Sequence, residues 1–268
     1  MQVALLCSVL GAAMVLGCGD DGDDGGDGGP RTDGGGGNAG VFDPSVTEVR
    51  IEIDHETGEA PYTGTIVGFG DTFGLSSANM RRVFGPRKQL TIPTTTAAME
   101  DIGAIADEQL TVDDLLALAA AHRDQRSAGA VYTYYVVFVS GLYTDGTGPR
   151  PNVLAVSIGS TGVIAMFKDV IAGTGGVVPN VEKFVEQSTL VHELGHAVGL
   201  VANGVATTSA HHDAAHGAHC TNDGCVMYYL NEGAGDMATF VRQYVTSGDA
   251  ILFDAACLAD VDALTGGP

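Results

Sequence analysis

The chain has 268 residues and a net charge of -21, because 33 Asp and Glu residues face only 12 Lys and Arg. So few cations cannot form a surface that neutralises phosphates, which excludes nucleic acids and anionic membrane surfaces as partners held by charge. The length and the 45% hydrophobic content are sufficient for one sizeable domain with a packed core. A globular enzyme, which we expect to be a monomer, is compatible with these values.

The first 17 residues, MQVALLCSVLGAAMVLG, form an apolar run that ends in small residues before Cys18. A membrane-spanning helix needs about 20 apolar residues, so this run is predicted to be a signal peptide. Residues 15–18, VLGC, resemble a bacterial lipobox, which implies that Cys18 is lipidated and becomes the mature N-terminus. No Lys or Arg precedes the apolar run, which leaves an ordinary secretory signal or a retained N-terminal helix as alternatives.

Residues 18–40 consist almost wholly of Gly and Asp and offer nothing to bury. We therefore predict a signal peptide over 1–17, a disordered tether over 18–40 and a folded domain over 41–268. The protein would be exported and lipid-anchored in a bacterial cell envelope, with the outer membrane or cell surface favoured. Its only membrane contact would be the lipid on Cys18.

Alternating or continuous apolar runs in the first part of the domain predict strands over residues 46–53, 131–139, 153–158 and 162–167, the last two joined by a turn over 159–162. Helices are predicted over residues 74–84 and 111–123, and the second begins with Thr111 followed by two Asp.

A buried helix is predicted from residue 181 to 198, where apolar residues recur at helical spacing. Asn180 could cap its start, and Gly199 would end it. Residues 200–236 are rich in Gly, Asn, Asp and His, so we expect a loop there, followed by a last helix over about 250–264.

The predicted helix 181–198 carries the sequence HELGH. His192 and His196 are four residues apart, so their rings lie on one helix face and can bind one Zn²⁺ ion. Glu193 is placed to act as a general base toward a zinc-activated water. The motif predicts metal-dependent hydrolysis of a protein or peptide substrate.

A catalytic zinc site needs a third protein ligand. Six of the eight histidines fall between residues 192 and 219, a clustering that core packing does not explain. The candidates for the third ligand are His211, His212, Asp213, His216, His219 and, further along, Glu232.

Two segments, HELGHAVGL (192–200) and HCTNDGCVM (219–227), together resemble the metzincin metalloproteases, whose long motif HExxHxxGxxH precedes a methionine turn. The match is narrower to the archaemetzincins, in which the third histidine is followed by Cys, four residues, Cys, one residue and Met. The resemblance implies an insertion of about 17 residues where Ala202 takes the place of the third histidine. It assigns His192, His196 and His219 as ligands, Glu193 as base, and Met227 as the methionine of the turn.

The same resemblance implies an α+β fold: a twisted mixed sheet packed on the active-site helix, then an irregular C-terminal subdomain that ends in a helix. The strand over 162–167 is a candidate edge for an extended substrate. The chain as a whole is also similar, more loosely, to membrane-anchored bacterial metalloproteases.

Archaemetzincins continue to a second CxxC that completes a structural zinc site, but here only Cys257 follows. A zinc ion held by four cysteines is therefore not expected. Cys220 and Cys225 are predicted to form a disulfide, with free thiols or another pairing as the alternative.

Tyr229, two residues after Met227, could donate a hydrogen bond to the oxyanion of the reaction, although ordinary packing explains it equally well. The sequence thus predicts a zinc-dependent endopeptidase. Two alternatives stay open: a catalytically silent surface lipoprotein that binds zinc, and a gluzincin-type peptidase with Glu232 as the third ligand.

Overall fold

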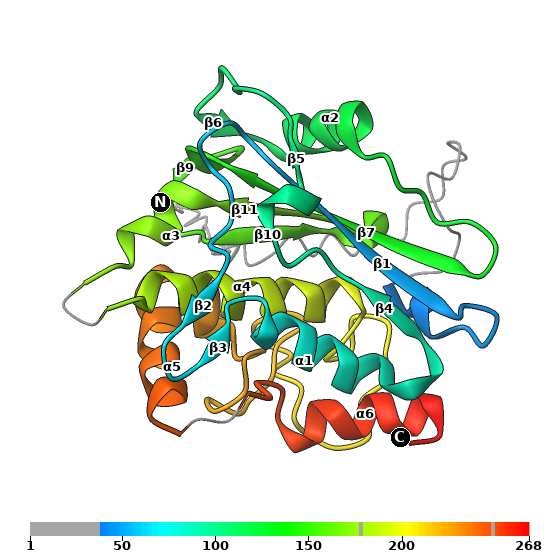
Figure 1. Ribbon diagram of the computed structural model, residues 1–268. Helices are drawn as coiled ribbons and strands as arrows, with labels where there is room; N and C mark the ends of the chain where they lie inside the picture. Colours follow the sequence, from blue (N-terminus) through cyan, green and yellow to red (C-terminus); the bar gives the residue numbers. More distant parts are fainter. Residues whose placement is uncertain (1–37, 177–178, 248–249, 268) are drawn as a thin grey trace, which may run out of the picture.

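The computed structural model describes residues 38–176, 179–247 and 250–267, so the predicted signal peptide and Cys18 lie outside the described residues. Its main sheet has six strands in the order β10-β11-β7-β1-β4, with β5 also paired to β1 (Figure 1). Their bounds are β1 Glu48–His55, β4 Gln89–Thr91, β5 Glu100–Asp101, β7 Val131–Val139, β10 Ala155–Ile158 and β11 Val163–Phe167.

The main sheet is mixed, as predicted. Strands β4, β5 and β7 pair with β1 in parallel, and β11 pairs with β7 in parallel, whereas β10 runs antiparallel to β11. Strand β7 is almost wholly buried, which explains why its sequence is a continuous β-branched and aromatic run. The structure also contains two small sheets. One consists of β2 Thr65–Ile66 and β3 Gly70–Asp71, and the other of β6 Gln109–Leu110, β8 Leu142–Asp145 and β9 Gly148–Arg150.

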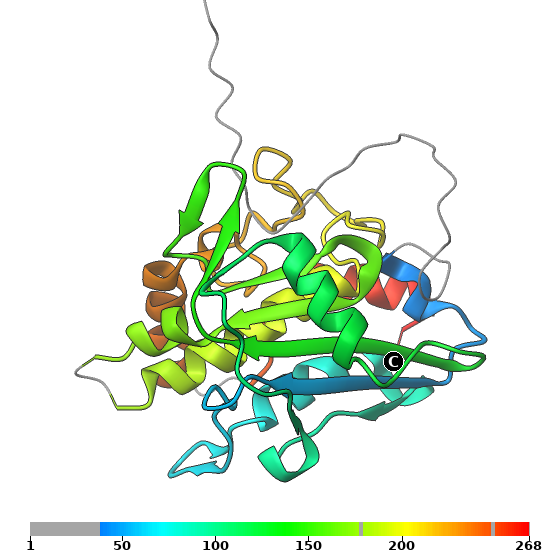
Figure 2. The ribbon, with the colours of Figure 1, turned by 90° about the horizontal axis from the view of Figure 1, so that it is seen from above.

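The described part of the chain contains six α-helices. They are α1 Gly74–Phe84, α2 Val112–His122, α3 Lys168–Gly173, α4 Val181–Ala197, α5 Ala234–Ser247 and α6 Ala255–Thr265. Helix α2 lies over one face of the sheet, and α4 lies under the other with α1 and α6 (Figures 1 and 2). Five short 3-10 helices complete the secondary structure: η1 Asn38–Phe42, η2 Gly85–Arg87, η3 Thr96–Ala98, η4 Gly159–Thr161 and η5 Tyr229–Glu232.

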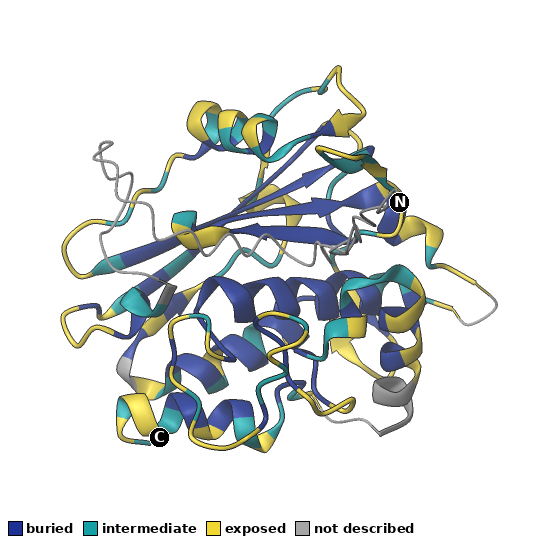
Figure 3. Ribbon diagram, turned by 180° about the vertical axis from the view of Figure 1, so that it is seen from behind, coloured by how far each residue is buried: buried dark blue, intermediate teal, exposed yellow. Residues whose placement is uncertain are grey.

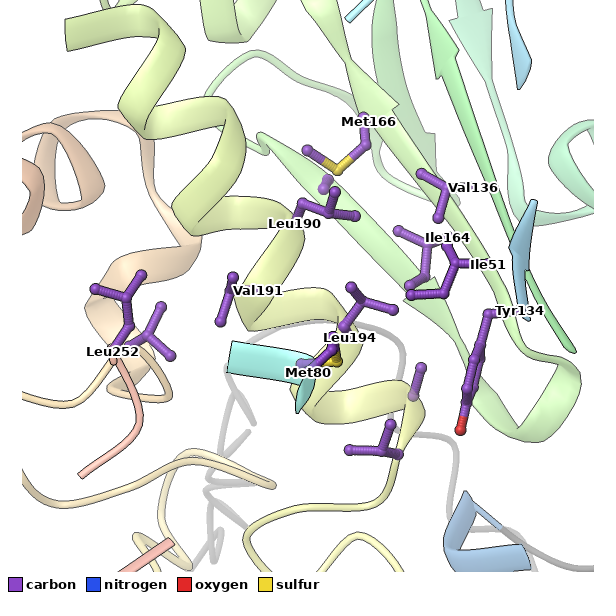
Figure 4. Close-up of a cluster of buried hydrophobic side chains, with 14 of the residues drawn as sticks. Ile51, Met80, Tyr134, Val136, Ile164, Met166, Leu190, Val191, Leu194 and Leu252 are labelled. Atoms are coloured by element: carbon purple, nitrogen blue, oxygen red, sulfur yellow. The ribbon is translucent and has the colours of Figure 1, made fainter. Parts of the chain in front are cut away.

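Helix α4 is the central helix of the molecule and is buried along nearly its whole length (Figure 3). Leu190 and Leu194 point from α4 toward the sheet residues Val136 and Ile164 (Figure 4), and all four side chains are fully buried. Burial of a leucine side chain stabilises a fold by about 1.5–3 kcal/mol. Since Leu194 lies inside the HELGH sequence, the packing that holds the helix on the sheet also fixes the rotation of its two histidines.

Polar contacts add further constraints on α4. The Ser76 hydroxyl of α1 donates to the Gln187 side chain at 2.7 Å. Lys168, at the start of α3, forms a buried ion pair with Glu186, which also accepts a hydrogen bond from the Tyr62 backbone at 2.7 Å. A buried charge is costly unless it is paired, so these contacts oppose rotation or sliding of the helix.

Most predicted elements are confirmed within one or two residues. Helix α1 has the predicted limits, and Thr111 caps α2 through a reciprocal capping box with Asp114. Asn180 precedes α4 as expected, but it has a left-handed conformation and makes no side-chain capping hydrogen bond.

Two predictions about the architecture are wrong. The loop expected over 200–236 ends earlier, because α5 begins at Ala234 and was not anticipated. Its Gly, Thr and Val residues are weak helix formers, and burial of Met237 and Val241 on one face compensates for them. Strand β11 is also not an edge, since β10 pairs along its outer side and is itself the edge strand.

Among the described helices, none combines the length and the apolar character that crossing a bilayer requires.

Candidate metal centre

The last two turns of α4 place His192 and His196 side by side in the interior. Their Nε2 atoms lie 3.0 Å apart, and the side chains are 0% and 4% exposed. Two nitrogens bound to one tetrahedral zinc ion at about 2.0–2.1 Å would be about 3.3 Å apart. The pair is therefore arranged to hold a single ion with little movement.

The chain turns sharply away from the centre after α4. Gly199 has a φ of 90°, and it is followed by Val201 and Ala202 with φ of 53° and 65°. A left-handed backbone conformation is unfavourable for residues other than glycine, so contacts with the surrounding structure must stabilise it at Val201 and Ala202. One such contact is the hydrogen bond from the Asn203 side chain to the carbonyl of His196, at 3.1 Å.

The segment over residues 201–218, which the sequence predicts to be an insertion, then returns to the centre, where His219 follows it. The ring centroid of His219 lies 5.4 Å from that of His192 and 4.8 Å from that of His196. His219 is 3% exposed, and its backbone carbonyl accepts a hydrogen bond from Asp213 at 2.7 Å. The sequence predicted that the chain would return to the two α4 histidines at His219, and the structure places His219 beside them.

Backbone carbonyls orient two of the three imidazoles. His192 Nδ1 donates to the carbonyl of Val226 at 2.7 Å, and His219 Nδ1 donates to the carbonyl of His216. A carbonyl only accepts, so Nδ1 must carry the proton, and Nε2 is left with the lone pair that binds a metal.

Burial keeps the helix histidines neutral, which is the form that a metal requires. Burial, together with the nearby His219, lowers the pKa of His192 to about 4, and burial lowers the pKa of His196 well below its usual value. Burial also acts on His219, but Glu232 and the carbonyl of His216 outweigh it and raise the pKa.

Glu232 joins the three histidines. Its Oε1 atom lies 2.8 Å from the buried Nε2 atom of His219. The ligand atoms of His192, His196, His219 and Glu232 all lie within 4.8 Å of one another. Three buried imidazoles and a carboxylate that converge in this way form a set of ligands that one metal ion can share.

Glu193 is 1% exposed on the same turn of α4, and its charge contributes to raising the pKa of His219. The predicted base therefore lies beside the predicted ligands. Three imidazoles and adjacent carboxylates form a donor set that suits Zn²⁺.

The other candidate ligands lie elsewhere. His212 Nε2 bonds the carbonyl of Gly217 at 2.8 Å, and His216 pairs with Asp213 at 2.8 Å. His211 lies against cysteines and not against the α4 histidines.

Tyr229 stacks on the ring of His216 with centroids 3.8 Å apart. This contact accounts for its packing, and its predicted role toward an oxyanion stays a prediction.

Met227, the predicted methionine of the turn, packs against Gly195 of α4, the residue before His196. It is fully buried, and a Cβ atom built on Gly195 would lie 2.4 Å from its sulfur. A side chain at residue 195 would therefore force the buried Met227 side chain to move, while the backbone of Gly195 has ordinary helical geometry.

The predicted disulfide between Cys220 and Cys225 is wrong. Cys220, Cys225 and Cys257 are all buried free thiols. Cys225 Sγ has Cys257 Sγ as a neighbour at 3.6 Å, because α6 brings a cysteine 32 residues away in the chain to the same place. Sequence spacing suggested the local pair and gave no signal for this tertiary contact.

Some contributors to the centre could not be found from the sequence. The carbonyls of Val226 and His216 orient two histidines, but backbone groups carry no sequence signature. Asn231, whose side chain donates to the carbonyl of Val226 at 3.1 Å, is similarly unmarked.

No protein-family model and no curated protein matches this sequence. Two solved structures of similar shape are archaemetzincin from Methanopyrus kandleri, with 12% identity and a TM-score of 0.42, and a zinc-dependent peptidase from Methanocorpusculum labreanum, with 14% identity and a TM-score of 0.41. The first alignment covers 83% of this chain and 97% of the other, and the second covers 80% and 99%.

The contact between Gly195 and Met227 gives a first prediction. Gly195→Ala should displace Met227, lowering the free energy of unfolding by about 1–3 kcal/mol and weakening zinc binding. Gly235→Ala is the matched control, because Gly235 is also helical and a Cβ there meets nothing within 4 Å. Thermal melts and zinc titrations measure both effects. Equal stability and zinc affinity for the two variants would contradict the packing described here.

A second prediction separates the two possible third ligands. His219→Ala should remove one equivalent of zinc relative to the wild type, whereas Glu232→Ala should retain it. Loss of an orienting partner already costs 10–100-fold in affinity, so loss of a ligand should cost at least about 100-fold. The zinc affinity of each variant, measured in competition with a chelating dye, decides between His219 and Glu232 as the third ligand. Loss of zinc only in Glu232→Ala would identify the carboxylate as the third ligand instead.

Proposed function

We propose that the protein is a zinc-dependent endopeptidase whose third ligand, His219, is supplied across an inserted loop. The observation that carries this proposal is the buried Glu193 carboxylate next to three converging imidazoles. A site that only stabilised the fold would have no use for an adjacent base, and burial of a carboxylate without a function is costly.

Each residue has a defined part in this proposal. His192, His196 and His219 hold the ion, which when bound supplies a Lewis acid that activates water and polarises the scissile carbonyl. Glu193 accepts the proton of the attacking water and returns it to the leaving amine. The buried surroundings strengthen these electrostatic interactions, because they exclude bulk water.

Strand β10 is the part of the sheet best placed to align a peptide. It is the edge strand, and no other described strand pairs along its outer side. Helix α4 packs against β10, so a substrate added there as an extra strand would run beside the helix that carries the centre. An acidic chain with a net charge of -21 favours substrates that are not strongly acidic.

The alternative of a catalytically silent zinc-binding lipoprotein has no specific observation in its favour. The gluzincin-type alternative is weaker than the proposal because His219 reaches the centre and is oriented there by a backbone carbonyl.

Glu193→Gln tests the mechanism. The amide keeps the size of the side chain but cannot accept the proton, so peptidase activity should fall by about 10²–10⁴-fold while zinc stays bound. Glu182→Gln, at a half-buried position in the first turn of the same helix, is the control and should leave activity unchanged. Turnover of a quenched peptide library, with and without a chelator, provides the assay. Activity retained in Glu193→Gln would reject the role of this base.

We also propose export and lipid anchoring at Cys18, which rests on the VLGC sequence and the apolar run before it. The mature protein should begin at Cys18 with an attached lipid, and Cys18→Ser should release it from the membrane fraction. Mass spectrometry of the N-terminal fragment is the measurement. An unmodified N-terminus elsewhere would favour an ordinary secretory signal.

A further inference from the structure

A carboxylate lies on the solvent side of the candidate metal centre. The three histidines of the centre, His192, His196 and His219, are 0%, 4% and 3% exposed, and Glu193 is 1% exposed. The side chain of Glu232, in contrast, is 21% exposed, although its oxygen belongs to the same group of ligand atoms. Glu232 is therefore the member of this group that a ligand arriving from solvent meets first.

Glu232 approaches the atom of His219 that is available to a metal. His219 Nδ1 donates to the carbonyl of His216, which leaves Nε2 as the ligand atom. Oε1 of Glu232 lies 2.8 Å from this same Nε2 atom. An oxygen and a nitrogen bound to one tetrahedral zinc ion at about 2.0–2.2 Å are about 3.4 Å apart. A small outward shift of the carboxylate would therefore place Oε1 on the ion that His219 holds.

The backbone around Glu232 is held on both sides. Asn231, the residue before it, donates from its side chain to the carbonyl of Val226 in the methionine turn, at 3.1 Å. Gly233, the residue after it, forms an antiparallel bridge with Val153, which leads into β10. The carboxylate can thus enter or leave the centre by rotation of its side chain, a motion that needs no change in the fold.

We propose that Glu232 is a displaceable fourth ligand, which closes the zinc site at rest and leaves it when a ligand with a metal-binding oxygen enters. The inference rests on the proposed function, in which the scissile carbonyl of a peptide is such a ligand. Three histidines and Glu232 give four protein ligands, and four protein ligands leave no open position for water. Glu232 must therefore turn away before Glu193 has a water proton to accept.

This closure also affects the choice of substrate. Part of the binding free energy of a peptide is used to displace the carboxylate, so the apparent affinity for every peptide is lowered by the fraction of time that the site is open. Peptides that bind weakly along the rest of the cleft are disfavoured most, because they do not compensate for the displacement.

The test is the affinity of the zinc-loaded full chain for acetohydroxamate, a small ligand that binds zinc through oxygen. A site that is open for a tenth of the time binds such a ligand about ten-fold more weakly than an open site. The dissociation constant should therefore fall by at least about ten-fold in Glu232→Ala relative to the wild type. Zinc should stay bound in the variant, because three histidines hold it and water takes the fourth position. Equal acetohydroxamate affinities for wild type and variant would overturn the inference.

Two further variants separate ligation from charge. Glu232→Asp keeps the charge but shortens the side chain, and the fixed backbone prevents compensation, so acetohydroxamate should bind as tightly as in Glu232→Ala. Asp236→Asn removes an exposed carboxylate four residues away and should bind acetohydroxamate as the wild type does. Tight binding in Glu232→Ala and Asp236→Asn with wild-type affinity in Glu232→Asp would show an effect of charge and contradict ligation.

Crystals of the zinc-loaded wild type provide a test that does not depend on the folding of variants. Oε1 of Glu232 should lie about 2.0–2.2 Å from the ion, and a soak with acetohydroxamate should turn the carboxylate away. A water molecule on the ion, with Oε1 more than about 3 Å away, would overturn the inference. Neither measurement uses peptide turnover. An open resting site in a protein whose peptidase activity depends on Glu193 would reject this inference alone, and a closed site without any turnover would reject the proposed function alone.

Discussion

The close packing of α4 against the sheet is the constraint on which the rest of the structure depends. Leu190 and Leu194 fill the space beneath Val136 and Ile164, which fixes the face that α4 turns away from the sheet. His192 and His196 project from that other side into a buried volume, where their lowered pKa values keep them neutral. Apolar packing on one side of α4 thus determines the direction and the protonation of the two histidines on its other side.

The insertion uses a different strategy, because it has few apolar side chains to bury. It leaves α4 through left-handed backbone at Val201 and Ala202 and is then held by polar contacts with α6. Thr208 and His211 both bond the buried carboxylate of Asp260, at 2.6 and 2.7 Å. These contacts with α6 explain how a polar loop of this length can bring His219 back to the centre.

The parts of the structure that local pattern determines could be predicted from the sequence. The helix face that carries the HELGH sequence follows from spacing, and the strand over residues 131–139 follows from an unbroken buried run. The parts that depend on distant contacts could not. Cys257 meets Cys225 only because α6 folds back, and α5 exists because Met237 and Val241 are buried against the rest of the domain. The sequence also predicted that the chain would return to the centre at His219, yet nothing in it revealed that His211 would turn toward the cysteines.

The central claim is that His219 completes a three-histidine zinc site across the insertion. An anomalous difference map at the zinc absorption edge, from crystals of the zinc-loaded protein, tests it directly. We expect a peak within about 2.0–2.1 Å of the Nε2 atoms of His192, His196 and His219. A peak bound by the two α4 histidines with His219 turned away, or no peak at this position, would contradict the account.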